Sequence, residues 1–169
     1  TYVYFETEVE LLTTFFRDYV FPATCVTGWN FFGYDYPYLF NRCENLGIDL
    51  QYLSPTGTWY KYKPQNADAD VKISLPKHKL LYDYMEIYIK WDRSVEVKES
   101  NKLDWVSETV LGTKKVVHQL GFKDMWEQEP VQYIFYNAID SILLREIDNK
   151  IKTSSAFLSL ANLMHVDAL

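Results

Sequence analysis

The first clear pattern along the chain is a stripe of apolar residues at helical spacing. The stripe consists of Val9, Leu12, Phe16 and Tyr19. Thr7, followed three residues later by Glu10, forms a capping box at its start, and Pro22 ends it. We therefore expect a helix here, with its apolar stripe facing a core. Residues 1–5 are rich in strand-forming side chains and predict a strand before this helix.

A second pattern is a short apolar run followed by a tight loop and another helix. Residues 23–26 predict a buried strand. The loop after it contains two glycines, which permit unusual backbone angles, and Asp35 and Pro37 suit the first turn of a helix. Asp35 thus lies where a strand passes into a helix, and ligands gather at such positions in open α/β folds. A helix N-cap is an equally good local explanation of Asp35.

The rest of the chain predicts a hairpin, one further strand and four helices. Residues 53–75 combine an aromatic and lysine-rich run, a turn-rich segment and a returning strand at 71–73, as a hairpin would. We expect the further strand at residues 80–83 and helices at 84–91, 103–111, 131–151 and 156–164. The residues that bound the predicted helices are Gly47, Asn101, Gly112 and Pro130.

Length and charge narrow the classes of function. The chain has 169 residues, enough for one domain with a sizeable core, and a net charge of −6, so the domain as a whole does not attract DNA. Contact with nucleic acid must be local, and carboxylates that await divalent cations fit this acidity. The two cysteines and three histidines form no disulfide or zinc pattern. With no membrane-spanning run and no signal peptide in the sequence, we expect a cytoplasmic protein (host-cell cytoplasm if viral) that does not bind membranes.

Two motifs resemble those of a known family. The first reads Thr-Gly-Trp-Asn at residues 27–30, Tyr-Asp-x-Pro-Tyr at 34–38 and Asn-Arg at 41–42. It resembles the second exonuclease motif of family B DNA polymerases, most closely that of the replicative polymerases of T-even-type bacteriophages. The second, Tyr-Asn-x-x-Asp at 136–140 with Ile147 and Asp148 after it, resembles the third exonuclease motif of the same family. The resemblance covers nearly the whole chain.

The resemblance implies a fold as well as an activity. The fold is an α/β, ribonuclease-H-like exonuclease fold over residues 1–169, truncated at its N-terminal strands. Residues 53–75 would form an inserted β-hairpin, opened by Ser-Pro-x-Gly at 54–57, that helps to hold primer and template apart. Tyr60 and Lys61 on this ribbon suit contact with bases and phosphates. An exposed hairpin without a special role is the alternative.

The resemblance also assigns roles to individual residues. Asp35 and Asp140 would act in catalysis as ligands of Mg²⁺ or Mn²⁺, and Tyr136 would position the attacking water or the scissile phosphate. Two ions about 3.5–4 Å apart can generate hydroxide and stabilise the leaving oxygen, and such hard cations need carboxylate ligands. The two carboxylates should therefore lie within about 8 Å of each other. A lysine near the site would be Lys115, with Lys114 as its competitor. On local grounds, a solvated surface residue is the better explanation of either one.

Two further residues are candidates for contact with DNA. The resemblance places Asn30 and Arg42 beside the metal site or against the substrate. Arg42 could equally pair with Glu44 on the surface of the predicted helix.

The family's first motif, an Asp-x-Glu on the central strand of the sheet, does not occur in the segment before Asp35. Residues 5–8 read Phe-Glu-Thr-Glu, lack the leading Asp and run into a helix cap, so we do not accept them as a substitute. We therefore expect a fragment with about half of the metal ligands, inactive by itself. Its expected partners are the single-stranded primer 3′ end, the remainder of the polymerase chain and a second copy of itself, paired through an exposed strand edge.

Three hypotheses follow from these patterns. The first is a fragment of a phage-type DNA-directed DNA polymerase, corresponding to the proofreading 3′→5′ exonuclease domain that hydrolyses the primer 3′ end in the intact enzyme. The second is a non-catalytic DNA-binding or assembly module that requires another polypeptide for activity. The third, an unrelated α/β binding domain, would require both motifs to be coincidences.

Overall fold

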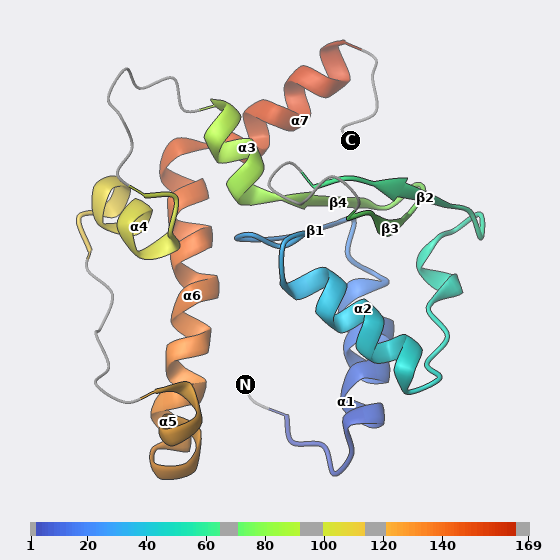
Figure 1. Ribbon diagram of the computed structural model, residues 1–169. Helices are drawn as coiled ribbons and strands as arrows, with labels where there is room; N and C mark the ends of the chain where they lie inside the picture. Colours follow the sequence, from blue (N-terminus) through green and yellow to red (C-terminus); the bar gives the residue numbers. More distant parts are fainter. Residues whose placement is uncertain (1–2, 65–70, 92–99, 114–120, 165–169) are drawn as a thin grey trace. The chain divides into compact units, whose positions relative to one another are not determined.

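The chain forms two compact units, and the boundary between them along the sequence falls within helix α3 (Tyr84–Trp91). Unit 1 contains the described residues up to Glu86, and unit 2 contains those from Ile87 onwards. The computed structural model describes residues 3–64, 71–91, 100–113 and 121–164 (Figure 1). Unit 1 combines helices with short strands, and unit 2 is helical over its described residues, so the chain as a whole is of mixed α/β class.

Helix α1 (Glu8–Thr14) opens unit 1 and continues as a π-helical segment over Phe15–Val20. The predicted cap is confirmed, because the Thr7 hydroxyl accepts the N–H of Glu10 at 3.2 Å. The buried side chains are Leu12, Phe16 and Val20, whereas Val9 and Tyr19 of the predicted stripe are exposed. The π-helical bond from the Phe21 N–H to the Phe16 carbonyl widens the turn, so the helix turns Val20 inward where Tyr19 was expected.

The strand predicted over residues 1–5 is not formed at Val3–Phe5, and residues 1 and 2 lie outside the described residues. Tyr4 is 88% exposed. Side chains that favour strands do so by packing against neighbours in a sheet, and this segment has no strand beside it among the described residues. Propensity alone was therefore a poor guide here.

Strand β1 (Cys25–Gly28) pairs in parallel with β4 (Leu80–Asp83). The register places Gly28 opposite Asp83, so the carboxyl ends of both strands meet at one edge. β4 and the helix after it, α3, have the predicted bounds. β1 begins two residues later than predicted, and Thr27 on this strand donates its hydroxyl to the Tyr82 carbonyl at 2.8 Å.

Strands β2 (Trp59–Tyr62) and β3 (Ile73–Pro76) pair antiparallel, as a hairpin requires. The returning strand lies at Ile73–Pro76, however, and not at the predicted residues 71–73. The turn that opens it is held by Ser54, whose side-chain oxygen accepts the Thr58 N–H at 3.0 Å and donates to the Lys77 carbonyl. The hairpin is thus fastened at its base by a buried serine.

Helix α2 (Asp35–Asn45) lies between two clusters of buried side chains. One cluster joins α2 to α1 through Cys43 and Phe16, and the other joins it to the hairpin through Tyr36 and Leu75. Both α1 and α2 lie on the same side of the strands in unit 1 (Figure 1). As predicted, Gly47 follows the end of α2 in the left-handed conformation, at φ 70°.

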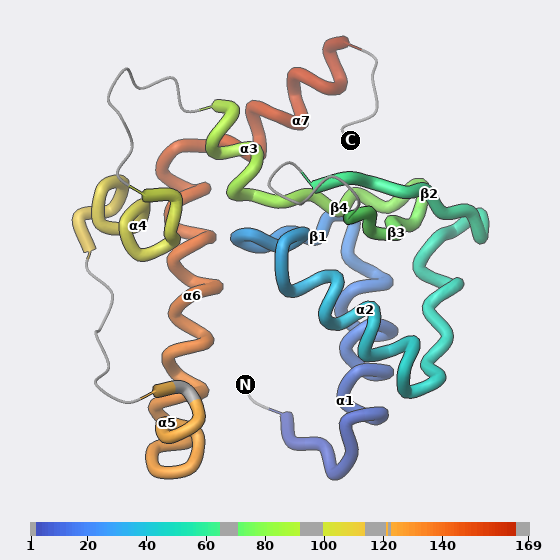
Figure 2. The backbone as a smooth tube through the Cα atoms, in the orientation of Figure 1, coloured from blue at the N-terminus to red at the C-terminus, as the bar shows by residue number. Residues whose placement is uncertain are grey.

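Unit 2 is built around α6 (Pro130–Ile151), which begins at the predicted proline. Helices α4 (Leu103–Leu111) and α5 (Phe122–Gln128) pack along it, with α5 beside its first turns (Figure 2), and α7 (Thr153–Leu163) follows it. The Lys150 ammonium donates to the Val110 carbonyl at 2.5 Å and joins α6 to the end of α4. Gly112 ends α4 as predicted, at φ 73°.

Three helix predictions in unit 2 need correction. Helix α7 begins at Thr153, three residues before its predicted start. The N-cap of α4 is Lys102 rather than Asn101, and its side chain makes no capping bond. The short helix α5 was not predicted, because it is too brief to show a full apolar period and no side chain caps its start. Among the described residues, no helix combines the length and apolar character that crossing a membrane requires.

The free edge of β1 generates a prediction about self-association. Among the described residues β1 pairs only with β4, so its other edge offers backbone donors and acceptors to a further strand. We expect the purified chain to dimerise through this edge, with a sedimentation coefficient that rises with protein concentration and with slower hydrogen exchange of the β1 amides in the dimer. A single monomeric species throughout the concentration series would contradict this.

Candidate functional site

The loop that joins β1 to α2, residues 29–34, has a demanding backbone conformation. Asn30 adopts a left-handed φ of 56°, and its carbonyl accepts the N–H groups of Gly33 and Tyr34 at 3.1 Å each. A Cβ atom on Gly33 would lie 2.3 Å from the Asn30 Oδ1 atom, so only glycine fits against the Asn30 side chain as it stands. The motif residues thus form a compact turn that fixes where α2 begins.

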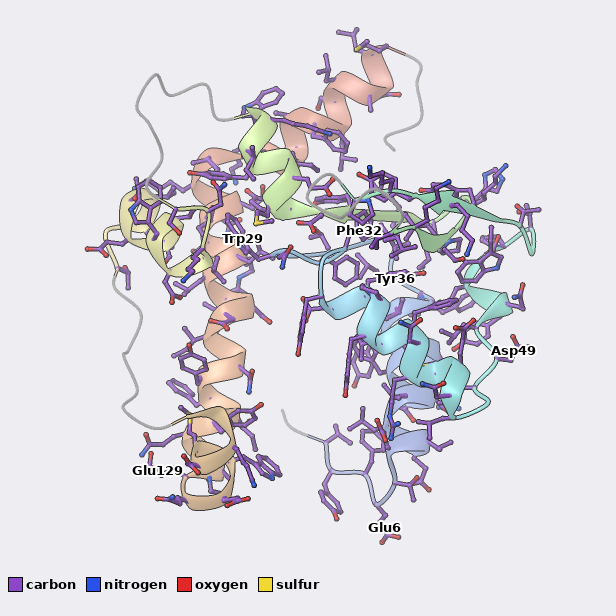
Figure 3. All side chains as sticks on the ribbon, in the orientation of Figure 1. Glu6, Trp29, Phe32, Tyr36, Asp49 and Glu129 are labelled. Atoms are coloured by element: carbon purple, nitrogen blue, oxygen red, sulfur yellow. The ribbon has the colours of Figure 1, made fainter. Side chains whose placement is uncertain are left out.

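Aromatic packing anchors this loop to the rest of unit 1. Phe31 and Phe32 are buried, and the Phe32 ring lies 5.1 Å from that of Tyr62 on β2. Tyr36, the second residue of α2, is buried and donates its hydroxyl to the Ser74 carbonyl on β3 at 2.6 Å. Phe32 and Tyr36 therefore hold the loop and α2 against the hairpin (Figure 3).

Asp35 is the first residue of α2 and follows the carboxyl end of β1 by one loop. The N-cap is Tyr34, so the explanation of Asp35 as an N-cap does not describe the structure. The residue is exposed, yet desolvation by the protein around it raises the pKa of its carboxyl above the ordinary value. Because the side chain is exposed, a ligand can reach the Asp35 carboxyl from solvent.

Sequence reasoning missed Asp83, the last residue of β4. It is 3% exposed, and its two carboxylate oxygens accept the Phe32 N–H at 2.9 Å and the Met85 N–H at 3.0 Å. Burial raises the pKa of Asp83, the Phe32 N–H opposes that rise, and the charge of Glu86 adds to it. The available signal was an apolar strand that ends in Asp and passes into a helix, the same signal that drew attention to Asp35.

A second buried carboxylate lies one turn beyond Asp83. Glu86, in the first turn of α3, is 6% exposed and accepts the Tyr62 hydroxyl at 2.7 Å. Burial, with this bond to Glu86, raises the pKa of Tyr62, so the phenol stays protonated and keeps donating. The bond fastens the hairpin to the start of α3.

The predicted DNA-contact residues have the following surroundings. Lys61 is exposed on β2 and donates to the Ser74 hydroxyl at 2.6 Å, while Tyr60 is half-buried. Arg42 pairs with Glu8 of α1 through two hydrogen bonds, at 2.7 Å and 2.5 Å, instead of with Glu44. Arg42 would have to leave Glu8 in order to bind a phosphate.

The remaining predicted residues belong to unit 2. Tyr136 and Asp140 are half-buried and lie one turn apart on α6, so they project from the same face of that helix. Lys115 and its competitor Lys114 lie outside the described residues. Asp35 belongs to unit 1 and Asp140 to unit 2, so the expected closeness of their carboxylates stays a prediction.

The two acidic residues of unit 1, Asp35 and Asp83, differ in what they can do chemically. Asp35 offers exposed carboxylate oxygens beside a helix N-terminus, whereas both oxygens of Asp83 already accept backbone N–H groups. Within either unit, the described residues contain no cluster of three His, Cys, Asp or Glu side chains that could hold a metal ion. Asp35 is thus suited to meeting a ligand, and Asp83 to holding the backbone.

Comparison with known proteins relates the chain to viral DNA polymerases. It is 28% identical over 152 residues to the DNA-directed DNA polymerase of Escherichia phage RB69, a match that covers 88% of this chain and 17% of the phage protein. It is 28% identical over 133 residues to the DNA polymerase catalytic subunit of Psittacid herpesvirus 1, a match that covers 70% of this chain and 11% of that protein. The chain therefore spans only a small part of each relative. No protein-family model matches it.

The burial of Asp83 predicts a pH dependence of stability. Since its pKa is raised, the folded protein keeps a proton at pH values where the unfolded chain has lost it. The free energy of unfolding should therefore fall as the pH rises from about 3.9, the ordinary pKa of Asp, through the raised value, and this contribution should be constant above it. Urea unfolding at a series of pH values isolates this contribution: the free energy of unfolding of the wild type, measured relative to that of Asp83→Asn, should fall over this pH range. Identical profiles would contradict the prediction.

Proposed function

We propose that this chain is part of the proofreading 3′→5′ exonuclease domain of a family B DNA polymerase of the T-even phage type. The observation that carries the proposal is the position of Asp35, exposed at the start of α2 just beyond β1, within the motif that resembles the second exonuclease motif. The relationship to two viral DNA polymerases supports it. So does the third-motif resemblance at Tyr136 and Asp140, which share one face of α6.

The donor chemistry fits divalent cations. Asp35 and Asp140 are the residues that would hold Mg²⁺ or Mn²⁺, since carboxylate oxygens are the ligands that such hard cations prefer. When bound, two such ions supply a hydroxide nucleophile and stabilise the leaving oxygen of a phosphodiester. Asp83 does not join this set, because burial and two backbone N–H bonds occupy its carboxylate.

The other residues would bind and orient the primer strand. Tyr136 would donate its hydroxyl to the scissile phosphate or to the attacking water, and Lys115 would offset the charge of the phosphate. Asn30, which lies in the loop just before α2, would contact the terminal nucleotide. Arg42 would bind a phosphate after release from Glu8, at the loss of an exposed ion pair that contributes little to stability.

The hairpin would act on the duplex beside this site. Lys61 is exposed on β2 and can reach a backbone phosphate, and Tyr60 on the same strand can meet a base. The bond from Tyr62 to Glu86 and the bond from Tyr36 to Ser74 tie this ribbon to α3 and α2. These two bonds hold the hairpin in place beside the site, where it would keep primer and template apart.

Paramagnetic NMR tests whether the two acidic residues share ions. We expect Mn²⁺ to broaden the amide signals around Asp35 and those around Asp140 at the same point in a titration, because a single ion held between the two carboxylates lies near both. In Asp35→Asn both effects should weaken together, since one of the two ligands of that ion is lost. Glu44→Gln, which changes an exposed carboxyl on the same helix, is the matched control and should leave both effects intact.

Other outcomes would decide against this assignment. Broadening that is confined to one of the two regions would show that Asp35 and Asp140 do not form a common site. The absence of broadening at both, even at high Mn²⁺ concentration, would favour the second hypothesis, a non-catalytic DNA-binding or assembly module that needs another polypeptide.

The 169-residue chain by itself should have negligible exonuclease activity. It offers two of the carboxylates that the family uses, and too few negative charges leave the repulsion between two divalent cations uncompensated. Incubation with Mg²⁺ and an end-labelled single-stranded oligonucleotide should therefore yield no ladder of shortened products. Robust cleavage that disappears in Asp140→Ala would show instead that another acidic residue completes the site.

A further inference from the structure

The loop before Asp35 depends on a side chain that is remote in sequence. Asp83 lies 51 residues beyond Phe32, yet its Oδ2 atom accepts the Phe32 N–H at 2.9 Å. The parallel register brings this about, because it sets Asp83 opposite Gly28, the last residue of β1 before the loop. The second oxygen, Oδ1, accepts the Met85 N–H, so a single carboxylate bonds to the loop and to the first turn of α3.

Packing around the loop does not replace this bond. Phe32 is 2% exposed, so its N–H has no access to water and would be left unsatisfied without an acceptor. The neighbouring N–H groups of Gly33 and Tyr34 bond to the Asn30 carbonyl within the loop itself. The bond to Asp83 therefore ties the loop backbone to β4.

We propose that Asp83 is a positioning residue that holds the β1–α2 loop in the conformation that presents Asn30 and Asp35. The effect of Asp83 on ligand binding at Asp35 rests on the proposed function. The role of Asp83 in holding the loop is independent of that function. Asp83 has no contact with substrate in this proposal, because it is buried and both of its oxygens bind backbone. The charge of Glu86 raises the pKa of Asp83, and the charge of Asp83 in turn raises the pKa of Tyr62.

Hydrogen exchange of individual amides in the 169-residue chain tests this directly. Asp83→Asn keeps the size of the side chain but leaves one acceptor oxygen for two N–H groups. We expect the Phe32 amide to exchange about tenfold faster in this variant, the factor that corresponds to the loss of one typical hydrogen bond. The amides of α1 should keep their rates, so that the change is local to the loop.

Ser54→Ala is the matched control. Ser54 is as buried as Asp83 and its side chain also accepts a backbone N–H, that of Thr58, but it holds the base of the hairpin. We expect faster exchange at Thr58 in this variant and an unchanged rate at Phe32. Equal acceleration at Phe32 in both variants would show that general loosening of the fold is responsible, and would overturn the proposal.

The Mn²⁺ titration separates positioning from a purely structural role. If Asp35 binds Mn²⁺ in the wild type, the Mn²⁺ concentration that broadens the Asp35 amide signal should rise about tenfold in Asp83→Asn. Such a loss is typical when a residue that orients a metal ligand is changed. The same Mn²⁺ concentration should be unchanged in Ser54→Ala. Wild-type protein without broadening at Asp35 would refute the proposed function, while the exchange rate of Phe32 would still decide the role of Asp83.

A measurement on the unmodified protein covers the case in which Asp83→Asn does not fold. NMR detects a scalar coupling across a hydrogen bond, so a coupling between the Phe32 amide nitrogen and the Asp83 carboxyl carbon would support the proposal. Its absence in a well-folded sample, or an unchanged Phe32 exchange rate in a folded Asp83→Asn, would overturn it.

Discussion

The parallel pairing of β1 with β4 is the constraint on which the architecture of unit 1 depends. The two strands are short and more than fifty residues apart in the chain, and their register sets Gly28 opposite Asp83. Parallel pairing brings the carboxyl ends of both strands to the same edge, so the loop that carries the motif residues and the start of α3 emerge side by side. A shift of one residue in this register would turn the Asp83 side chain to the opposite face of β4 and away from the Phe32 N–H.

Burial of the Asp83 carboxylate at this edge is unfavourable in itself, although the carboxylate satisfies two backbone N–H groups. Removing Asp83 from water disfavours its charged form and raises its pKa. Two backbone N–H donors offset part of that penalty and satisfy groups that the fold would otherwise leave unpaired. The same edge carries Asp35, whose exposed carboxyl has a different environment. Two acidic residues at the ends of neighbouring elements can thus serve two purposes, one structural and one directed at a ligand.

The hairpin is integrated with this region through polar bonds at buried positions. Tyr62 donates to Glu86, and Tyr36 donates to the Ser74 carbonyl. Between them lie the rings of Phe32 and its neighbours, which fill the space between α2 and the strands. The described strands of the hairpin are thus joined to α2 and to the start of α3, and the exposed Lys61 lies on one of these strands.

The sequence by itself determined the features that depend on a few neighbouring residues. Pro130 marks the start of α6, Gly47 and Gly112 follow the ends of α2 and α4, and the Thr7 cap starts α1. The bounds of β4 and the existence of the hairpin also follow from local patterns. Only the tertiary structure decided which face of α1 is buried, that Val3–Phe5 forms no strand, that Arg42 pairs with Glu8, and that Asp83 holds the loop before Asp35. The physical reason is the same in each case. Helix caps and turns act through backbone groups within one turn of the residue concerned, whereas burial, strand pairing and side-chain partnership depend on groups that are brought together from distant parts of the chain.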